Sequence, residues 1–135
     1  MRERRIATKE TIMQATPMFI FYVTDPAASA RFYADALGAP VVYEASDFAI
    51  LPLGQGARLG LWRTENVQPR AGLAPGGAEL DIALADGEAL MAAEARLAAQ
   101  GVTILQPLTT LGFGQAVTVA DPDGHRLRLY VPAMP

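Results

Sequence analysis

The stretch VADPDGHRLRLYVP, residues 119–132, combines residue types that often do chemistry in proteins. It holds His125, the single histidine of the chain, directly after an acidic turn and before Arg126 and Arg128. A histidine can ligate a metal ion or act as a general base near neutral pH. In a strand, however, alternate side chains point to opposite faces, so His125 and Arg128 are expected on different faces. The position directly after Gly124 therefore predicts a solvent-exposed histidine near a rim rather than a ligand or a base.

The same alternation divides the other strands into a face that packs under a helix and a face that points inward. Phe19, Phe21 and Val23 are predicted to pack under a helix. Trp62 either fills the core or stacks on a flat ligand, because Gly60 beside it leaves an aromatic face uncovered. The inward positions, together with a glycine-flanked phenylalanine that could form a mobile lid, make up the candidate ligand-binding set: Met18, Ile20, Tyr22, Arg58, Gly60, Trp62, Glu79, Asp81, Phe113, Arg126, Arg128 and Tyr130.

Several kinds of chemistry do not fit the sequence. The chain has no cysteine, which excludes disulfides, thiolate metal sites and cysteine nucleophiles. Ser29 and Ser46 have no suitably placed histidine for a nucleophilic triad. The short glycine motifs at 53–56 and 112–114 lack the strand-to-helix context of a phosphate-binding loop.

Charge and length limit the classes of partner that the protein can have. The chain has 135 residues, a formal charge of −3 and a pI near 5.0, which argues against a nucleic-acid partner. The basic run within residues 1–16 is interrupted by Glu3 and Glu10 and reads as a mobile N-terminal tail. No signal peptide and no apolar run of membrane-spanning length is present in the sequence, so a cytoplasmic protein without a membrane partner is expected.

Two segments have helical signals. The first runs from Asp25 to Gly38, with an aspartate suited to the N-cap, Pro26 at the first helical position and a glycine after the end. The second runs from Asp86 to Gly101, with the same aspartate and glycine signals at its ends. Hydrophobic alternation predicts strands at 18–24, 40–44, 47–53, 58–63, 78–85, 102–106, 115–120 and 125–131.

The order of these elements is a weak internal duplication, because each helix follows one strand and precedes three more. Superposing the two capping aspartates places Met18 opposite Glu79, each seven residues before its aspartate. A segment rich in proline and glycine, 64–77, separates the copies. We therefore expect an α+β fold in one domain over 17–132, made of module 17–63, linker 64–77 and module 78–132.

The paired modules, the segment DPAASARFYADALG and the late ADPDGHRLRLY resemble the vicinal oxygen chelate superfamily, which includes glyoxalase I, bleomycin-resistance proteins and extradiol dioxygenases. The resemblance covers about residues 17–132. It implies two strand-helix-three-strand modules that form curved sheets around a cavity, commonly within a homodimer.

In metal-dependent members of that superfamily, histidine, glutamate or glutamine stands at four inward positions, one on each of four strands. The resemblance places these positions at Met18, Gly60, Glu79 and Arg128. An arginine is a permanent cation that repels a metal ion, a thioether is a poor ligand for hard cations, and glycine offers no side chain. We therefore expect no bound metal and no cofactor, and a Glu79–Arg128 salt bridge in the cavity wall instead.

The resulting hypothesis is a metal-free protein that binds a small molecule, such as a planar aromatic compound or an antibiotic, and sequesters it unchanged. The alternative is a lyase, isomerase or dioxygenase-type enzyme of the same superfamily. Such an enzyme would use a metal site in another strand register, or Glu79 or Asp81 as general base. A homodimer is expected as well, because two open sheets in so short a chain leave apolar edges to cover.

Overall fold

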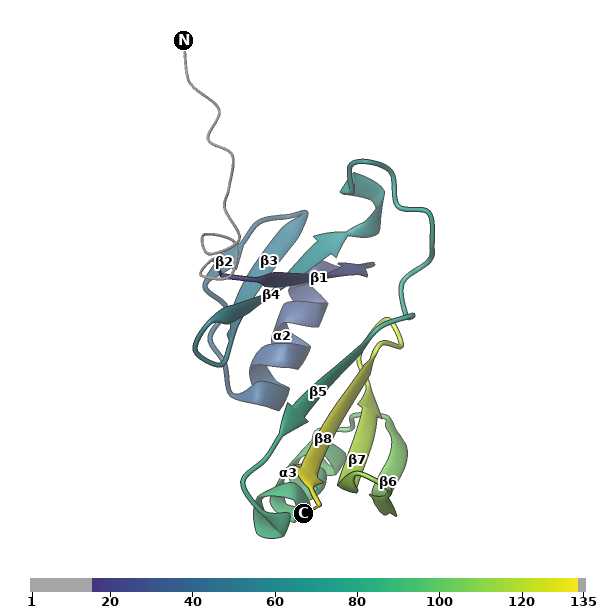
Figure 1. The fold of residues 1–135 in the computed structure, drawn as a ribbon. Helices are drawn as coiled ribbons and strands as arrows, with labels where there is room; N and C mark the ends of the chain where they lie inside the picture. Colours follow the sequence, from purple (N-terminus) through teal and green to yellow (C-terminus); the bar gives the residue numbers. More distant parts are fainter. Residues whose placement is uncertain (1–15, 134–135) are drawn as a thin grey trace, which may run out of the picture.

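The structure is a computed structural model that describes residues 16–133, so all but Thr16 of the expected N-terminal tail lies outside the described residues. The chain forms two units with the same element order (Figure 1). The first unit consists of β1 (Met18–Val23), α2 (Pro26–Leu37), β2 (Tyr43–Glu44), β3 (Phe48–Leu53) and β4 (Ala57–Arg63). After a 3-10 turn at Thr64–Asn66, the second unit consists of β5 (Glu79–Ala83), α3 (Gly87–Ala99), β6 (Ile104–Leu111), β7 (Gly114–Ala120) and β8 (Arg126–Pro132).

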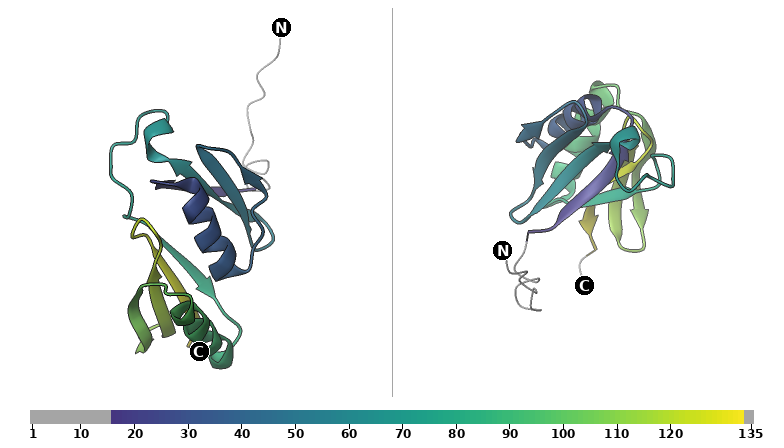
Figure 2. Two further views of the ribbon diagram at one scale, coloured as in Figure 1. Left: turned by 180° about the vertical axis from the view of Figure 1, so that it is seen from behind. Right: turned by 90° about the horizontal axis from the view of Figure 1, so that it is seen from above.

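Each unit folds into a four-stranded mixed sheet, with strand order β1-β4-β3-β2 in the first and β5-β8-β7-β6 in the second. In both sheets the first and last strands of the unit pair in parallel, and the remaining neighbours are antiparallel. Figure 2 shows α2 and α3 each covering one face of a sheet. The expected α+β class and the duplicated topology are therefore confirmed.

Both helices form where their end signals predict them. The Asp25 carboxylate accepts a hydrogen bond from the Ala27 N–H at 3.1 Å, and Gly38 ends α2 in the left-handed conformation with φ of 66°. The Asp86 carboxylate accepts from the Ala89 N–H at 2.8 Å to cap α3. These local contacts satisfy backbone groups that a helix end would otherwise leave unpaired.

The strands agree with the prediction less closely at two places. The strand expected at 102–106 is instead the longer β6, whose pairing with β7 shifts register between Ile104 and Gln106 and again between Gln106 and Thr109. Such irregularities interrupt the alternation on which the prediction relied. The strand expected at 40–44 shortens to the two residues of β2.

Each unit has its own core, and α2 contributes to both. In the first core Val23, Leu59 and Leu61 are fully buried. In the second core Leu90, Leu97, Val117 and Leu127 pack with Ala36, which belongs to α2. Arg96 of α3 also donates hydrogen bonds to the carbonyl oxygens of Asp35 and Ala36 at 2.7 and 2.9 Å. The end of the first helix is thus built into the second unit.

Two expectations about the faces need correction. Phe21 and Val23 pack under α2 as predicted, but Phe19 is 55% exposed because the core beneath the helix does not reach the beginning of β1. The two sheets also do not close around one shared cavity within the chain (Figure 1). Each sheet therefore presents its inward face separately.

Candidate functional site

The second sheet holds a charged cluster on the face opposite its helix. Arg128 Nε lies 3.1 Å from Glu79 Oε2, and its Nη2 lies 3.3 Å from Glu79 Oε1. The expected salt bridge is therefore present, and it is diagonal, because the residue directly opposite Arg128 on β5 is Asp81. Asp81 Oδ1 lies 3.9 Å from the same Nε. The pair is only partly buried, since the side chains of Arg128 and Glu79 are 16% and 35% exposed.

The pKa values of Glu79 and Asp81 are shifted in opposite directions. The hydrogen bond from Arg128 holds the pKa of Glu79 below its usual range, against the opposing effect of desolvation. Burial, and then the hydrogen bond with Glu79, raises the pKa of Asp81. Relative to ordinary carboxyl groups, Glu79 therefore loses its proton at lower pH and Asp81 at higher pH.

Two aromatic side chains extend the cluster toward the β6–β7 turn. Phe113 meets Tyr130 edge to face with ring centroids 5.7 Å apart. The Arg128 guanidinium carbon lies 5.7 Å from the Phe113 ring centroid, within the range of a cation–π contact. Five members of the candidate set therefore lie on the second sheet, and a sixth, Phe113, lies in the turn between β6 and β7. The five are Glu79, Asp81, Arg126, Arg128 and Tyr130.

A cleft of about 230 Å³ opens beside these arginines, on the side of β6 and β7. Its lining residues are Leu105, Gln106, Thr118, Arg126 and Arg128. The first three are absent from the candidate set. Thr118 could have been found, because it alternates with the core residues Val117 and Val119 and pairs directly with Arg128. Leu105 and Gln106 lie at the register shifts of β6, which the sequence pattern does not reveal.

The remaining residues of the candidate set lie on the first sheet, on a face that is mainly apolar. A Cβ atom at Gly60 would lie 2.6 Å from Ile20 Cδ1, 2.9 Å from Phe48 Cζ and 3.0 Å from Met18 Sδ. Neighbouring side chains thus fill the space above Gly60, and the stacking of a ligand on Trp62 stays a prediction. Trp62 is partly buried and meets Phe48 edge to face at 5.9 Å. Arg58, which precedes Gly60 on the same face, is exposed.

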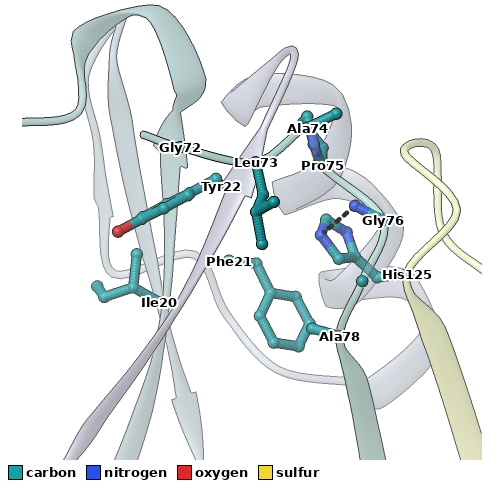
Figure 3. Close-up of a pocket in the computed structure, with 11 residues that line it drawn as sticks. Ile20, Phe21, Tyr22, Gly72, Leu73, Ala74, Pro75, Gly76, Ala78 and His125 are labelled. Atoms are coloured by element: carbon teal, nitrogen blue, oxygen red, sulfur yellow. Dashed lines mark hydrogen bonds between the residues drawn. The ribbon is translucent and has the colours of Figure 1, made fainter. Parts of the chain in front are cut away.

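A second cleft, of about 290 Å³, lies between β1 and the linker (Figure 3). Ile20, Phe21 and Tyr22 line it on one side and residues 72–78 on the other. Tyr22, a member of the candidate ligand-binding set, is 37% exposed and lines this cleft.

His125 also lines this cleft, and its environment corrects the prediction of an exposed histidine. The residue is 2% exposed and stacks on Phe21, with ring centroids 4.8 Å apart. Its Nδ1 lies 2.8 Å from Asp121 Oδ2, and its Nε2 accepts a hydrogen bond from the Gly76 N–H at 3.0 Å, drawn as a dashed line in Figure 3. The imidazole is buried because the linker folds back over it.

His125 belongs to a buried polar network centred on Asp121. Burial alone would raise the pKa of Asp121, but hydrogen bonds from His125 and Tyr33 lower it below its usual range. The Tyr33 hydroxyl donates to Asp121 Oδ2 at 2.7 Å, and burial followed by the charge of Asp121 raises the Tyr33 pKa far above normal. Because Nε2 accepts from Gly76, the hydrogen of the neutral ring is on Nδ1 and points to Asp121. Both ring nitrogens are therefore occupied in holding the turn and the linker.

The residues at the superfamily's metal positions do not fit a metal ion. Met18 and Gly60 lie on the first sheet, while Glu79 and Arg128 neutralise each other on the second. Within residues 16–133, no group of three or more histidine, cysteine, aspartate or glutamate side chains could hold an ion. His125 does not supply a ligand, since its two nitrogens are engaged elsewhere.

Comparison with known proteins places this geometry in a family. The family model described as the Glyoxalase/Bleomycin resistance protein/Dioxygenase superfamily matches residues 15–129. The chain belongs to this superfamily. No curated protein matches the sequence.

Three solved structures illustrate the similarity. Protein ATC0852 from Agrobacterium tumefaciens is 38% identical, with a TM-score of 0.77 over 87% of this chain and 96% of that one. A glyoxalase-related enzyme from Fulvimarina pelagi is 27% identical, with a TM-score of 0.75 over 87% of this chain and 88% of that one. Lactoylglutathione lyase from Agrobacterium tumefaciens shares the fold at 19% identity, with a TM-score of 0.72 over 87% of this chain and 92% of that one.

Among the described residues, no helix is long and apolar enough to cross a membrane.

Proposed function

We propose that this protein binds a small organic molecule without a resident metal ion, and that the inward face of the second sheet is its recognition surface. The observation that carries the proposal is the Arg128–Glu79 ion pair, which stands where metal-dependent relatives are expected to hold ligands. A guanidinium at that point opposes a cation and favours binding of polar ligand groups. A planar aromatic compound or an antibiotic, sequestered unchanged in the cytoplasm, is the ligand class we favour.

A second candidate function is proton transfer by Asp81. Its pKa is raised, first by burial, so its carboxylate is a stronger base than that of an ordinary aspartate. Arg128 at 3.9 Å partly opposes that shift. The carboxylate is also 44% exposed, so water competes with any substrate in this structure.

We also propose that the protein works as a homodimer. Large apolar side chains are exposed at the beginning of β1 and around β2: Phe19 is 55%, Val42 58% and Tyr43 52% exposed. Covering such side chains stabilises association in proportion to the apolar area removed from water. Light scattering coupled to size-exclusion chromatography should give twice the chain mass of 14.4 kDa, and a monomer at micromolar concentration would contradict this proposal.

The test of function is equilibrium binding of a panel of planar aromatic compounds and antibiotics, followed by mass analysis of each bound compound. Recovery of the compound unchanged supports sequestration, whereas a chemically altered compound supports the enzymatic alternative. Asp81→Asn separates the two outcomes, because it should abolish turnover by a general base while leaving binding largely intact.

Elemental analysis of the purified protein tests the absence of a metal independently. We expect far less than one transition metal per chain. A stoichiometric content of nickel, zinc, iron or manganese would overturn the metal-free proposal.

A further inference from the structure

The cleft on the second sheet is shaped and charged for a particular chemical group. We propose that it binds an oxyanion group of the ligand, a carboxylate or a phosphate, with Arg126 as the charged donor and Thr118 and Gln106 as neutral donors. This inference rests on the proposed function, since it specifies the ligand class of the same surface.

The first argument is the distribution of charge. Glu79 and Asp81 lie on β5, on the far side of β8 from β7 and β6, and they engage Arg128. The cleft on the near side is lined by two arginines and no acidic residue. An anion placed there meets guanidinium groups first, and Glu79, one of the two carboxylates that would repel it, is already paired with Arg128.

The second argument is that Arg126 has no hydrogen-bonded side-chain partner among the described residues, although its charge helps to lower the pKa of Glu79, the residue opposite it on β5. Within residues 16–133 its side chain makes no hydrogen bond or ion pair, and the residue is exposed at the beginning of β8. Its backbone N–H alone is engaged, donating to the Ala78 carbonyl oxygen at 3.0 Å. A guanidinium has planar donors that match a carboxylate or phosphate in a two-point contact. Arg126 is therefore free to turn toward the cleft that it lines.

The third argument is an unpartnered hydroxyl. Thr118 is 2% exposed, and its Oγ1 has no hydrogen-bond partner among the described residues. A buried hydroxyl without a partner costs free energy, so its presence beside a cleft points to a partner from outside the chain. The corresponding position of the first sheet is Ile50, since Ile50 pairs with Gly60 as Thr118 pairs with Arg128. The hydroxyl is thus a property of the second sheet alone.

The cleft also limits the size of the group. Its volume of about 230 Å³ accommodates a carboxylate or phosphate with a few attached carbons, and Leu105 offers these an apolar contact. Gln106 stands opposite Thr118 on β6, so its amide can donate from the other wall. A charged head in the cleft with an apolar body outside it is the ligand shape that follows.

The test uses three probes of similar size on the full-length protein: benzoate, phenyl phosphate and the neutral benzyl alcohol. Binding is followed by shifts of the Thr118 and Gln106 amide resonances in NMR titrations. We expect at least one anion to bind about tenfold more tightly than benzyl alcohol. The tighter of the two anions tells whether the natural group is a carboxylate or a phosphate.

Matched variants identify the donors. Arg126→Met should weaken anion binding about tenfold, Arg126→Lys less because the charge remains, and Thr118→Val measurably but least. Arg31→Met and Thr110→Val change exposed residues of the same types on α2 and β6, and both should bind as the natural protein does. Circular dichroism confirms that each variant is folded.

The outcomes separate this inference from the proposed function. Equal binding of all three probes, or anion binding that Arg126→Met leaves unchanged, overturns the oxyanion site but not small-molecule binding. The oxyanion site is overturned, but small-molecule binding is not, if benzoate and phenyl phosphate do not bind while neutral members of the panel do. Failure of every probe and of the entire panel overturns both.

Discussion

The two sheets share one topology but have opposite inward faces. In the first, Met18, Ile20 and Phe48 close over Gly60 and leave an apolar, filled surface. In the second, the position equivalent to Gly60 is Arg128, which holds two carboxylates on one side and borders a cleft on the other. The same backbone thus carries a packed apolar wall in one copy and a charged surface beside a cleft in the other.

Side-chain size explains much of this difference. In the first sheet, β3 lies next to Gly60 and carries Phe48 and Ile50. In the second sheet, β7 lies next to Arg128 and carries Ala116 and Thr118. Smaller residues on β7 leave room beside the long arginine side chains, and the room becomes the cleft. The two units therefore differ in the size of the side chains at these facing positions while keeping the same strand order.

The largest expected effect concerns the buried polar network centred on Asp121, at the β7–β8 turn of the second unit. Asp121→Ala removes the acceptor for the Tyr33 hydroxyl, the His125 ring and the backbone N–H groups of Asp123 and His125. Leaving these groups unpaired in the interior should lower the free energy of unfolding by about 3–5 kcal/mol. Urea denaturation measures this, with Asp35→Ala on the exposed side of α2 as the matched control.

The same network predicts a pH dependence. Because the pKa of Asp121 is lower in the folded protein, its contribution is complete above the unfolded pKa near 4 and is lost as the pH falls through the folded value. The natural protein should therefore lose more stability than Asp121→Ala on acidification below about pH 4. Parallel pH profiles for the two proteins would contradict the assignment.

A smaller effect is expected when the first sheet is crowded. Gly60→Ala places a methyl group within 3.0 Å of Ile20, Phe48 and Met18, whose flexible ends must move, so we expect about 1–3 kcal/mol of destabilisation. Gly56→Ala is the control, because no atom lies within 4 Å of its added Cβ. If thermal unfolding shows both variants to be equally stable, the first face is not filled as described.

The ion pair of the second sheet should have a modest effect. Arg128→Ala should cost about 1–2 kcal/mol, less than a fully buried pair, because both side chains retain contact with water. The double variant Glu79→Gln with Arg128→Met removes both charges at similar volume and should be more stable than Arg128→Ala. A double-mutant cycle measures the coupling, and strictly additive changes would show that the pair contributes nothing.

The smallest effect is a pair of opposite pKa shifts. Relative to ordinary carboxyl groups, Glu79 should lose its proton at a lower pH because of the hydrogen bond from Arg128, and Asp81 at a higher pH because of burial. Carboxyl carbon chemical shifts followed against pH test this. Arg128→Met should raise the pKa of Glu79, and an unchanged value would mean that the arginine does not act on it.

Local signals predicted the parts of the fold that local contacts determine. Asp25 and Asp86 mark helix starts because their carboxylates cap backbone groups within a few residues. The Glu79–Arg128 pair could also be predicted, because alternation gives the face on which each residue lies and the resemblance to the superfamily implies that their two strands are neighbours.

Contacts between distant segments could not be predicted in the same way. His125 is buried because Gly76, 49 residues earlier in the chain, returns to cover it. The cleft depends on register shifts in β6 and on the absence of large side chains on β7, which no single strand reveals. The space above Gly60 could not be judged from one strand, because the side chains that fill it come from two other strands.

The placement of Ala36 in the second core has a consequence for how the chain can be divided. A fragment ending in the linker would expose the end of α2, with Ala36 and the carbonyl groups that Arg96 binds facing water. The complementary fragment would lack part of its own interior. Neither half of the chain is thus self-sufficient, and the two halves expressed separately should reassemble with each other rather than fold as independent proteins.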